Sequence, residues 1–181
     1  TGAFQGNAHF ITNSGISKTL TSLGQEDIFV LKIGTDGQLI WVISAGETSD
    51  DIGYDIAVNS NGDIFVTGTF QLGVNFNGPT LNSTNYKNDA FIWAIAPDGS
   101  TNSVTNYPSF FDSEGYDITV DRNDQVICTG SYFDQVIEAT SFFVWKIDSN
   151  GVERFKKLFF GADRALGYGV TTDSENNIIV A

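Results

Sequence analysis

Acidic side chains are the groups of this chain that could most readily do chemistry. Its 181 residues include 22 Asp and Glu against 9 Lys and Arg, which gives a formal net charge of −13. Seven of the acids gather in two short stretches: Glu47, Asp50, Asp51 and Asp55, then Asp112, Glu114 and Asp117. Grouped carboxylates could bind a cation or a glycan, or supply the acid and base of glycoside hydrolysis. The simpler interpretation, which we favour, is that Asp55 and Asp117 accept hydrogen bonds from backbone amides at a tight corner.

Aromatic, amide and basic side chains in the two variable loops could complete a ligand face. These candidates are His9, Phe10, Phe76, Asn82, Tyr86 and Lys87. Phe10 and Phe76 each lie nine residues after a Thr-Gly pair, and because equivalent aromatic residues usually pack, we expect them to anchor their loops. The candidate ligand face comprises Glu47, Asp50, Asp51, Asp112, Glu114, Phe76 and Tyr86.

Nucleophilic and metal chemistry has few candidates in this sequence. His9 is the only histidine and Cys128 the only cysteine, so neither a catalytic triad nor a closed zinc site is readable. Cys128 stands where two similar segments have valine, so we expect a small buried hydrophobe. The oxygen-rich stretches 59–63 and 121–124 lack the bidentate Glu of a calcium loop, and we interpret them as hairpin turns. No enzyme activity, transition metal or required cofactor is predicted, and calcium is left open.

The overall composition excludes several classes of protein. A hydrophobic content of 41% with only 17% charged residues is typical of a globular chain rather than a disordered one. The excess of acids argues against nucleic acid as a partner, because such binding depends on Lys and Arg neutralising phosphates. A single cysteine excludes an internal disulfide framework, and no apolar run approaches the roughly 20 residues that span a bilayer.

Internal repeats determine the expected fold. Three motifs each occur three times: Gly53-Tyr54-Asp55-Ile56-Ala57-Val58 at 53, 115 and 167; Thr-Gly at 1, 67 and 129; and Asp27-Ile28-Phe29-Val30-Leu31-Lys32-Ile33 at 27, 89 and 141. Cutting at Thr-Gly gives repeat units 1–66, 67–128 and 129–180. Only the separation from Thr-Gly to the third motif differs between units, at 26, 22 and 12 residues. Variation confined to one loop per unit usually maps to one face of a repeat protein, often the binding face.

Each unit is predicted to form four short antiparallel strands. Three of them are clear at 54–58, 63–70 and 90–95, and a weaker fourth strand is best seen at 39–43. Nearly continuous apolar runs such as 28–33 indicate strands that are covered on both faces. We therefore predict an all-β fold, a β-propeller with three four-stranded antiparallel blades, with a β-sandwich or a β-helix as the alternative. Its core should bury Phe65, Trp93, Phe143 and Trp145.

The same residues resemble a known family. Residues 54–58, 62–68 and 27–33, together with Asp36-Gly37-Gln38-Leu39-Ile40-Trp41, are similar to the bacterial β-propeller repeat called SBBP, and the match touches nearly the whole chain. The third unit departs from the pattern, with Gly169 in place of the aspartate and a shorter loop. The resemblance implies a propeller in secreted or cell-surface bacterial proteins, and it implies no shared catalytic residues.

The expected function is recognition of a partner. Alternate connections of a four-stranded meander lie at one end, so the variable loops should share an end with the acidic links between blades. We expect a non-enzymatic binding or scaffold module of a secreted or cell-surface bacterial protein, which recognises a protein or glycan partner through this face. The alternative is a propeller that binds glycans or hydrolyses glycosides with its acidic face.

The ends of the chain predict a further kind of partner. Ala181 takes the position of Thr67 and Thr129, so the chain begins and stops halfway along equivalent strands. Closed propellers use about four to eight blades. We therefore expect other propeller blades to complete these three, either from a larger parent chain or from another copy. A dimer of six blades is one closed solution.

Overall fold

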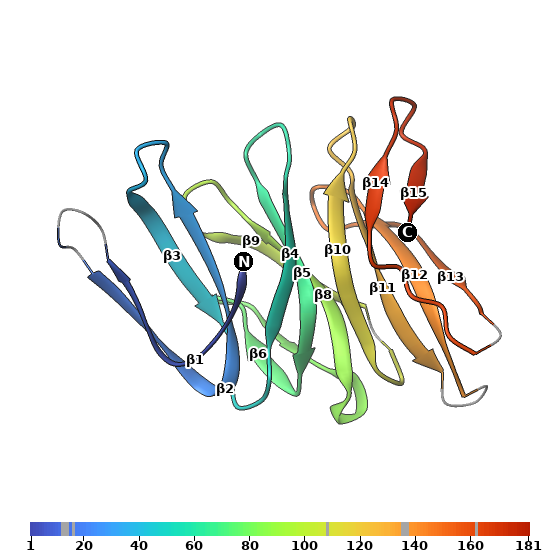
Figure 1. Cartoon of the computed structure of the whole chain (residues 1–181), viewed down its shortest axis with the longest axis horizontal. Coiled ribbons are helices and arrows are strands. Elements are labelled where there is room, and N and C mark those ends of the chain that lie inside the picture. Colours follow the sequence, from blue (N-terminus) through green and yellow to red (C-terminus); the bar gives the residue numbers. More distant parts are fainter. Residues whose placement is uncertain (12–14, 16, 108, 135–137, 162) are drawn as a thin grey trace.

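The computed structural model describes residues 1–11, 15, 17–107, 109–134, 138–161 and 163–181, and within them the chain is all-β (Figure 1). This described part contains fifteen strands and one 3₁₀ turn, Thr84–Tyr86, and no α-helix. It includes no helix of the length and hydrophobicity needed to cross a membrane. Every pair of neighbouring strands is antiparallel. The predicted all-β class is confirmed.

The strands form four sheets that stand side by side in chain order and are numbered 1 to 4 here (Figure 1). Sheet 1 consists of β1 (Gly2–Ile11), β2 (Ser17–Ile33) and β3 (Leu39–Ala45). Sheet 2 consists of β4 (Ile52–Val58), β5 (Ile64–Gln71), β8 (Asn88–Ile95) and β9 (Thr101–Tyr107). Sheet 3 consists of β10 (Ser113–Val120), β11 (Val126–Asp134), β12 (Ala139–Ile147) and β13 (Glu153–Phe159). Sheet 4 is the pair β14 (Val170–Thr172) and β15 (Ile178–Val180), and β6 (Gly73–Asn75) and β7 (Thr80–Asn82) form a small separate hairpin.

The prediction of three complete four-stranded sheets is only partly right. Sheets 2 and 3 have four strands in meander order, whereas the described part of sheet 1 has three strands and that of sheet 4 has two. The physical reason lies in the motifs, because the first strand of a sheet carries the Gly-Tyr motif. Sheet 1 opens with a Thr-Gly motif instead, and sheet 4 has the Gly-Tyr motif but no following copy of the third motif.

Three apolar clusters fill the spaces between successive sheets. In β8, the side chains of Phe91, Trp93 and Ile95 pack against sheet 1. Those of Ala90, Ile92 and Ala94 alternate with them and pack against sheet 3. A strand covered on both faces therefore needs the continuous apolar run that its sequence shows. The predicted burial of four large side chains is confirmed: Phe65, Trp93, Phe143 and Trp145 are all buried.

The Thr-Gly and Gly-Tyr motifs bring neighbouring sheets into close contact. The hydroxyl of Thr67 donates a hydrogen bond to the carbonyl of Phe91 at 2.8 Å, and Thr129 does the same to Phe143 at 2.7 Å. A Cβ on Gly115 or Gly167, in the next sheet, would overlap these two hydroxyl oxygens. Thr1 repeats the arrangement, since it donates to Phe29 at 3.0 Å and lies against Gly53. The first glycine of each Gly-Tyr motif is thus required by the threonine of the preceding unit.

The connections gather at two opposite ends of the sheets (Figure 1). The tight turns after β4, β10 and β14 lie at one end, which we call the turn end. The link between sheets 1 and 2, residues 46–51, and the hairpin β6–β7 lie at the other end, which we call the loop end. This is the arrangement that the meander order predicts for links and variable loops.

The variable stretch of the first unit is mostly strand rather than loop. β1 and β2 continue their ladder outward to the pair Ile11 and Ser17, with a bulge between Gln5 and Asn7. Pairing with the adjacent segment lets this stretch extend the sheet without a core of its own. Residues 12–14 and 16 of this stretch, and 135–137 of the third unit's stretch, lie outside the described residues.

Candidate ligand face

Asp51 is a buried structural carboxylate. One of its oxygens accepts a hydrogen bond from the backbone N–H of Glu47 at 3.1 Å, and the other accepts from that of Gln71 at 3.3 Å. Because amides of the chain itself occupy both oxygens, Asp51 fixes the link between sheets 1 and 2. Asp51, one of the residues of the predicted ligand face, is therefore turned inward. Glu47 is half-buried and Asp50 is exposed, so these two remain at the surface.

Asp27, at the start of β2's copy of the third motif, is a second buried acid and was not among the predicted site residues. It is 2% exposed, and one of its oxygens accepts from the N–H of Leu23 at 3.1 Å. Its other oxygen has no hydrogen-bond partner among the described residues. A pocket of about 270 Å³ lies beside it, lined in part by Glu47, Asn75 and Asn77. The recurrence of aspartate at 27 and 89 is the sequence signal that could have identified it.

Burial is the main cause of unusual ionisation in this pair of acids. It raises the pKa of Asp51 to about 7, against the two backbone hydrogen bonds, and the charges of Asp27 and Asp50 add to the increase. Burial also raises the pKa of Asp27, against the hydrogen bond from Leu23. Asp51 therefore gains its charge close to neutral pH.

The titration of Asp51 should make the protein less stable as pH rises. The pKa of Asp51 in the unfolded chain is about 3.9. The neutral carboxyl therefore stabilises the folded state fully below about pH 4. This contribution to the free energy of unfolding, on the order of 4 kcal/mol, is lost as the pH rises to about 7. Asparagine at position 51 cannot ionise, so Asp51→Asn should not lose this contribution. Its free energy of unfolding, relative to that of the unsubstituted protein, should therefore rise by about 2–3 kcal/mol between about pH 5 and pH 8. Urea unfolding at the two pH values measures this difference.

The control for this prediction is Asp36→Asn in the turn after β2. The side-chain oxygen of Asp36 accepts from the N–H of Gln38 at 3.0 Å, and asparagine can keep that bond. This variant should retain the pH dependence of the unsubstituted protein. The same retention in Asp51→Asn would show that the Asp51 carboxyl does not titrate in this range.

The acids where sheet 2 leads into sheet 3 do not form a cluster. Asp112 accepts from the N–H of Asn88 at 3.1 Å and forms a 3.5 Å ion pair with Lys87. Glu114 is half-buried, and Ser113, which takes the place of Asp51, is fully buried. Within the described residues, no group of three Asp, Glu, His or Cys side chains is placed to hold a metal ion.

Asp55 and Asp117 connect neighbouring sheets. One oxygen of Asp55 accepts from the N–H of Ile118 at 2.9 Å, and Asp117 accepts from the N–H of Val170 in the same way. The predicted hydrogen bonds to backbone amides are confirmed, but the predicted tight corner is wrong because each carboxylate reaches the first strand of the next sheet. Burial raises the pKa of Asp117 to about 6, and its hydrogen bond with Asp55 adds to the increase.

Three tyrosines outside the predicted site form a stripe: Tyr54 on β4, Tyr116 on β10 and Tyr168 just before β14. The ring centroids of Tyr54 and Tyr116 are 5.9 Å apart, and those of Tyr116 and Tyr168 are 5.3 Å apart in a stacked arrangement. We call these three residues the tyrosine stripe. Tyr168 is 62% exposed, and Glu114 lies near Tyr54 and Tyr116, where its charge adds to the effect of burial in raising both pKa values. The repeated tyrosine of the Gly-Tyr motif was the available signal.

Phe76 anchors the loop between β5 and β8. Its side chain is fully buried, and its ring contacts Phe70, Phe91 and Trp93 at centroid distances of 6.0, 5.0 and 5.5 Å. The expected anchoring role is confirmed, and the same burial removes Phe76 from the candidate ligand face. Phe10 is only half-buried and packs on Phe29 at 5.9 Å.

Tyr86 lies beside an open pocket at the loop end. The pocket has a volume of about 440 Å³ and is lined by Leu72, Gly73, Asn82, Ser83, Asn85 and Tyr86. Tyr86 is 78% exposed, and both it and Asn85 have positive φ angles, 59° and 55°. Non-glycine residues rarely adopt this backbone conformation, and such residues concentrate at functional sites.

The loop that carries Tyr86 is held in place by buried Asp89. One oxygen of Asp89 accepts from the N–H of Thr84 at 3.1 Å and from the amide of Asn106 at 2.9 Å. The side chain of Gln71 donates to the carbonyl of Tyr86 at 3.1 Å. These bonds fix the backbone on both sides of Asn85, so the exposed tyrosine is presented by a tethered loop.

His9 lies at the surface and Cys128 lies in the core. His9 is exposed, and its Nδ1 lies 2.9 Å from the hydroxyl of Thr19. Cys128 is fully buried in the core between sheets 2 and 3, as expected, and lies 3.1 Å from the hydroxyl of Thr67. Burial raises the pKa of its thiol to about 12, so the reactive thiolate is not formed near neutral pH.

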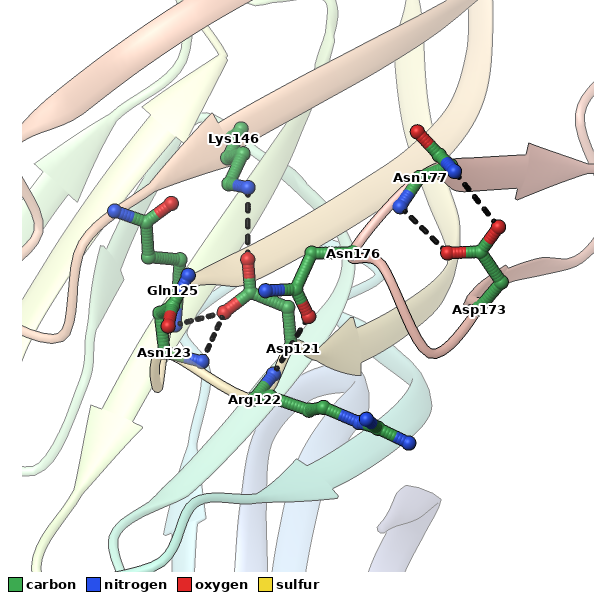
Figure 2. Close-up of polar contacts among 8 residues, drawn as sticks. All are labelled: Asp121, Arg122, Asn123, Gln125, Lys146, Asp173, Asn176 and Asn177. Atoms are coloured by element: carbon green, nitrogen blue, oxygen red, sulfur yellow. Dashed lines mark hydrogen bonds and ion pairs between the residues drawn. The ribbon is translucent and has the colours of Figure 1, made fainter.

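The oxygen-rich turns use their side-chain oxygens within the turn. In Figure 2, Asp121 accepts from the backbone N–H groups of Asn123 and Gln125 at 2.8 and 3.0 Å, and its other oxygen pairs with Lys146. Asn59 likewise accepts twice within the stretch 59–63. These residues are hairpin turns closed by their own aspartate or asparagine, as the sequence predicted.

Neighbouring turns are also bonded to each other. The N–H of Arg122 donates to the side chain of Asn176 at 3.2 Å, which Figure 2 shows between sheets 3 and 4. The N–H of Ser60 donates to Asp124 at 2.9 Å at the equivalent place between sheets 2 and 3. Asp124 and Asn176 have φ angles of 57° and 63°, where the first of these turns has Gly62. Their side chains therefore combine turn formation with contact between sheets.

Comparison with known proteins finds a similar solved structure but no matching family. No family profile matches the sequence, and no curated protein matches it. Among solved structures, a protein of unknown function from Bacteroides caccae is similar over 99% of this chain, with a TM-score of 0.35 and 9% identity. The chain spans 64% of that protein's length.

Proposed function

We propose that the chain is part of a β-propeller in which each sheet is a blade. The support is repetition of the contacts between sheets. The Thr-to-Gly contact occurs three times, and the Asp-to-amide and turn-to-turn hydrogen bonds occur twice each. Identical contacts at equivalent positions set the same rotation from each sheet to the next, and such a rotation about one axis generates a propeller. The first strands β4, β10 and β14 are neighbours and would line its axis.

We further propose that the protein is a non-enzymatic binding or scaffold module of a secreted or cell-surface bacterial protein. Its placement outside the cell rests on the resemblance to the SBBP repeat. For Asp51 a structural role is favoured over a catalytic one, because its two oxygens accept hydrogen bonds from backbone amides rather than facing a solvent-lined cleft. A carboxylate held in this way supports a fold rather than activating a substrate.

The partner would bind at the loop end, at the pocket beside Tyr86. The observation that carries this proposal is an exposed aromatic side chain on a tethered, strained loop. Tyrosine provides a large contact area at low cost in side-chain entropy, which makes it frequent among residues that dominate binding energy. Asn82 and Asn85 line the same pocket and offer amide hydrogen bonds.

Loss of the Tyr86 side chain should weaken partner binding without unfolding the protein. A phage-displayed library of random peptides serves as the probe, and peptides selected by the unsubstituted chain are retested against Tyr86→Ala. We expect a loss of about 2 kcal/mol, or roughly 30-fold in affinity. Phe110→Ala, which also truncates an exposed aromatic side chain, is the control and should bind normally. Failure to select peptides, or equal binding by Tyr86→Ala, would contradict the proposal.

Glycan binding at the tyrosine stripe is a second candidate function. Sugars pack their apolar faces on exposed aromatic rings, and a nearby carboxylate can accept hydrogen bonds from their hydroxyls. The stripe has both features, since Tyr168 is exposed and Glu114 lies beside Tyr116. A printed glycan array tests it: signals that Tyr168→Ala and Glu114→Gln both reduce, and Tyr86→Ala leaves unchanged, would favour this site over the loop end.

A further inference from the structure

A polar pocket lies between sheets 2 and 3 at the turn end. Its volume is about 460 Å³, within the usual range of about 300–1,000 Å³ for ligand pockets. The turn after β4, the start of β9 and the turn after β12 form its walls. Its lining residues are all polar: Asn61, Asp63, Asn102, Ser103, Ser149 and Asn150. None of them belongs to the loop end or to the tyrosine stripe, so this pocket is separate from both.

The equivalent space between sheets 1 and 2 is filled by side chains. There the indole Nε1 of Trp41 donates a hydrogen bond to the carbonyl of Pro97 at 3.0 Å, and Nζ of Lys32 donates to the same oxygen at 2.9 Å. A Cβ on Gly99 would lie 3.1 Å from the indole, so the turn after β8 packs closely on this ring. Trp41 and Lys32 thus close the contact between these two sheets.

Short side chains replace both of these donors between sheets 2 and 3. Ser103 stands opposite Ala94 in the strand pairing of sheet 2, at the positions where sheet 1 has Trp41 opposite Lys32. The turn after β12 has the same hydrogen bonds as the turn after β8, so the carbonyl of Ser149 takes the place of the acceptor. An alanine side chain cannot donate, and a serine side chain is too short to fill the space of an indole. The pocket is therefore the volume that a ring occupies in the equivalent contact.

Hydrogen bonds hold the walls of the pocket in position. One oxygen of Asp63 accepts from the side-chain amide of Asn102 at 3.2 Å, and the other accepts from that of Asn59 at 3.1 Å. In the turn after β4, Ser60 donates to Asp124 of sheet 3 from its N–H at 2.9 Å and from its hydroxyl at 2.6 Å. A ligand would therefore enter a pocket that is already formed, which lowers the entropy cost of binding.

The chemistry of the lining suits a ligand that carries many hydroxyl groups. A carboxylate accepts hydrogen bonds, whereas amide and hydroxyl side chains both donate and accept them. The hydroxyls of a sugar ring do both, all around its edge. A flat apolar ligand would leave the polar side chains without partners, at a cost in binding free energy. An anion is disfavoured because Asp63 is the only charged residue among the described residues that line the pocket.

We propose that this pocket binds one monosaccharide ring of a glycan. The ring takes the place that the indole of Trp41 has between sheets 1 and 2. Its hydroxyls exchange hydrogen bonds with the side chains of Asp63, Asn102 and Asn150, and the carbonyl of Ser149 accepts a further one. This site goes beyond the binding proposed at the loop end, and neither site depends on the other.

Filling the pocket with a side chain tests the proposal. Ser103→Trp introduces the residue that sheet 1 has at this position, so its indole should occupy the pocket and leave the protein folded. The probes are D-glucose, D-galactose, D-mannose and N-acetyl-D-glucosamine, each titrated into isotope-labelled protein and followed by NMR. The backbone amide signals of Asn102, Ser103 and Asn150 should shift saturably with at least one sugar at millimolar concentration, and Ser103→Trp should abolish these shifts.

Two further variants make the result specific. Ile40→Trp adds an indole at an exposed position on β3, outside the pocket, and should bind the sugar normally. Asn102→Ala removes one hydrogen-bonding partner and leaves the pocket open, so it should weaken binding roughly tenfold. Because Asn102 is exposed, this variant also decides the matter if Ser103→Trp does not fold.

Four results would overturn the proposal. The first is that none of the sugars gives saturable shifts. The second is that a folded Ser103→Trp still binds the sugar, and the third is that Asn102→Ala binds it with unchanged affinity. The fourth is that the shifts appear at Tyr116 and Tyr168 instead, which would place the sugar at the tyrosine stripe.

Discussion

Replacing Gly130 with alanine should destabilise the protein by at least about 3 kcal/mol. A Cβ at this position would overlap the carbonyl oxygen of Glu114 on the neighbouring strand β10. Both groups belong to the backbone of a hydrogen-bonded ladder, so neither can turn away as a flexible side chain could. Relief requires β10 to move, and β10 also packs on β4 and β14. Urea unfolding of the variant measures the loss.

Gly169→Ala is the matched control for that substitution. The nearest atom to a Cβ at Gly169 is an oxygen of Asp117 at 3.8 Å, an ordinary contact. Because alanine restricts the unfolded chain more than glycine does, this variant should be unchanged or more stable by up to about 1 kcal/mol. Equal stability of the two variants would show that β10 and β11 do not approach as closely as described.

The sequence predicts the repeated parts of the fold because the same packing constraint selects the same residues in each unit. Thr-Gly recurs because its threonine hydroxyl donates a hydrogen bond to the neighbouring strand, as Thr67 does to Phe91. Its glycine leaves room for a carbonyl oxygen that a Cβ would overlap, as at Gly68 beside Ile52. The apolar third motif recurs since its strand is covered on both faces. The positions of Trp93 and Trp145 in the core follow from this pattern alone.

The positions of the acids could not be predicted in the same way. Glu47, Asp50 and Asp51 are close in sequence, yet only Asp51 is buried. Its direction depends on the path of the link, which places the N–H groups of Glu47 and Gln71 within reach. These contacts form only once β5 has paired, so the spacing of the acids in the sequence does not predict them.

Hydrogen bonds between sheets were also beyond sequence reasoning. Asp55 lies in the strand that the sequence predicts at 54–58, but its hydrogen bond with the N–H of Ile118 depends on how sheet 3 packs against sheet 2. The sequence predicts half of a strand at 1–4 and a loop from there to Asp27, because the length of this stretch varies between units. Its described residues, 5–11, 15 and 17–26, mostly extend β1 and β2 instead, since strand pairing needs only backbone groups and tolerates a polar sequence.

Replacing Phe76 with alanine should cost about 3–5 kcal/mol, the usual range for a fully buried phenylalanine. Three aromatic rings surround it, so little of the resulting cavity can close. The carbonyl of Phe76 also accepts from Thr101 at 2.8 Å, so loss of the ring should free the hairpin β6–β7 and raise amide exchange there. Urea unfolding and hydrogen exchange measure the two effects.

Tyr86→Ala separates anchoring from recognition within the same loop. Its ring is exposed, so truncation should change stability by no more than about 0.5 kcal/mol. Phe76→Ala should therefore lose both stability and peptide binding, because the anchor holds the loop that presents Tyr86. A Phe76→Ala variant that is destabilised by less than about 1 kcal/mol would show that this phenylalanine is not the anchor. One that keeps full peptide binding would show that recognition does not depend on the position of this loop.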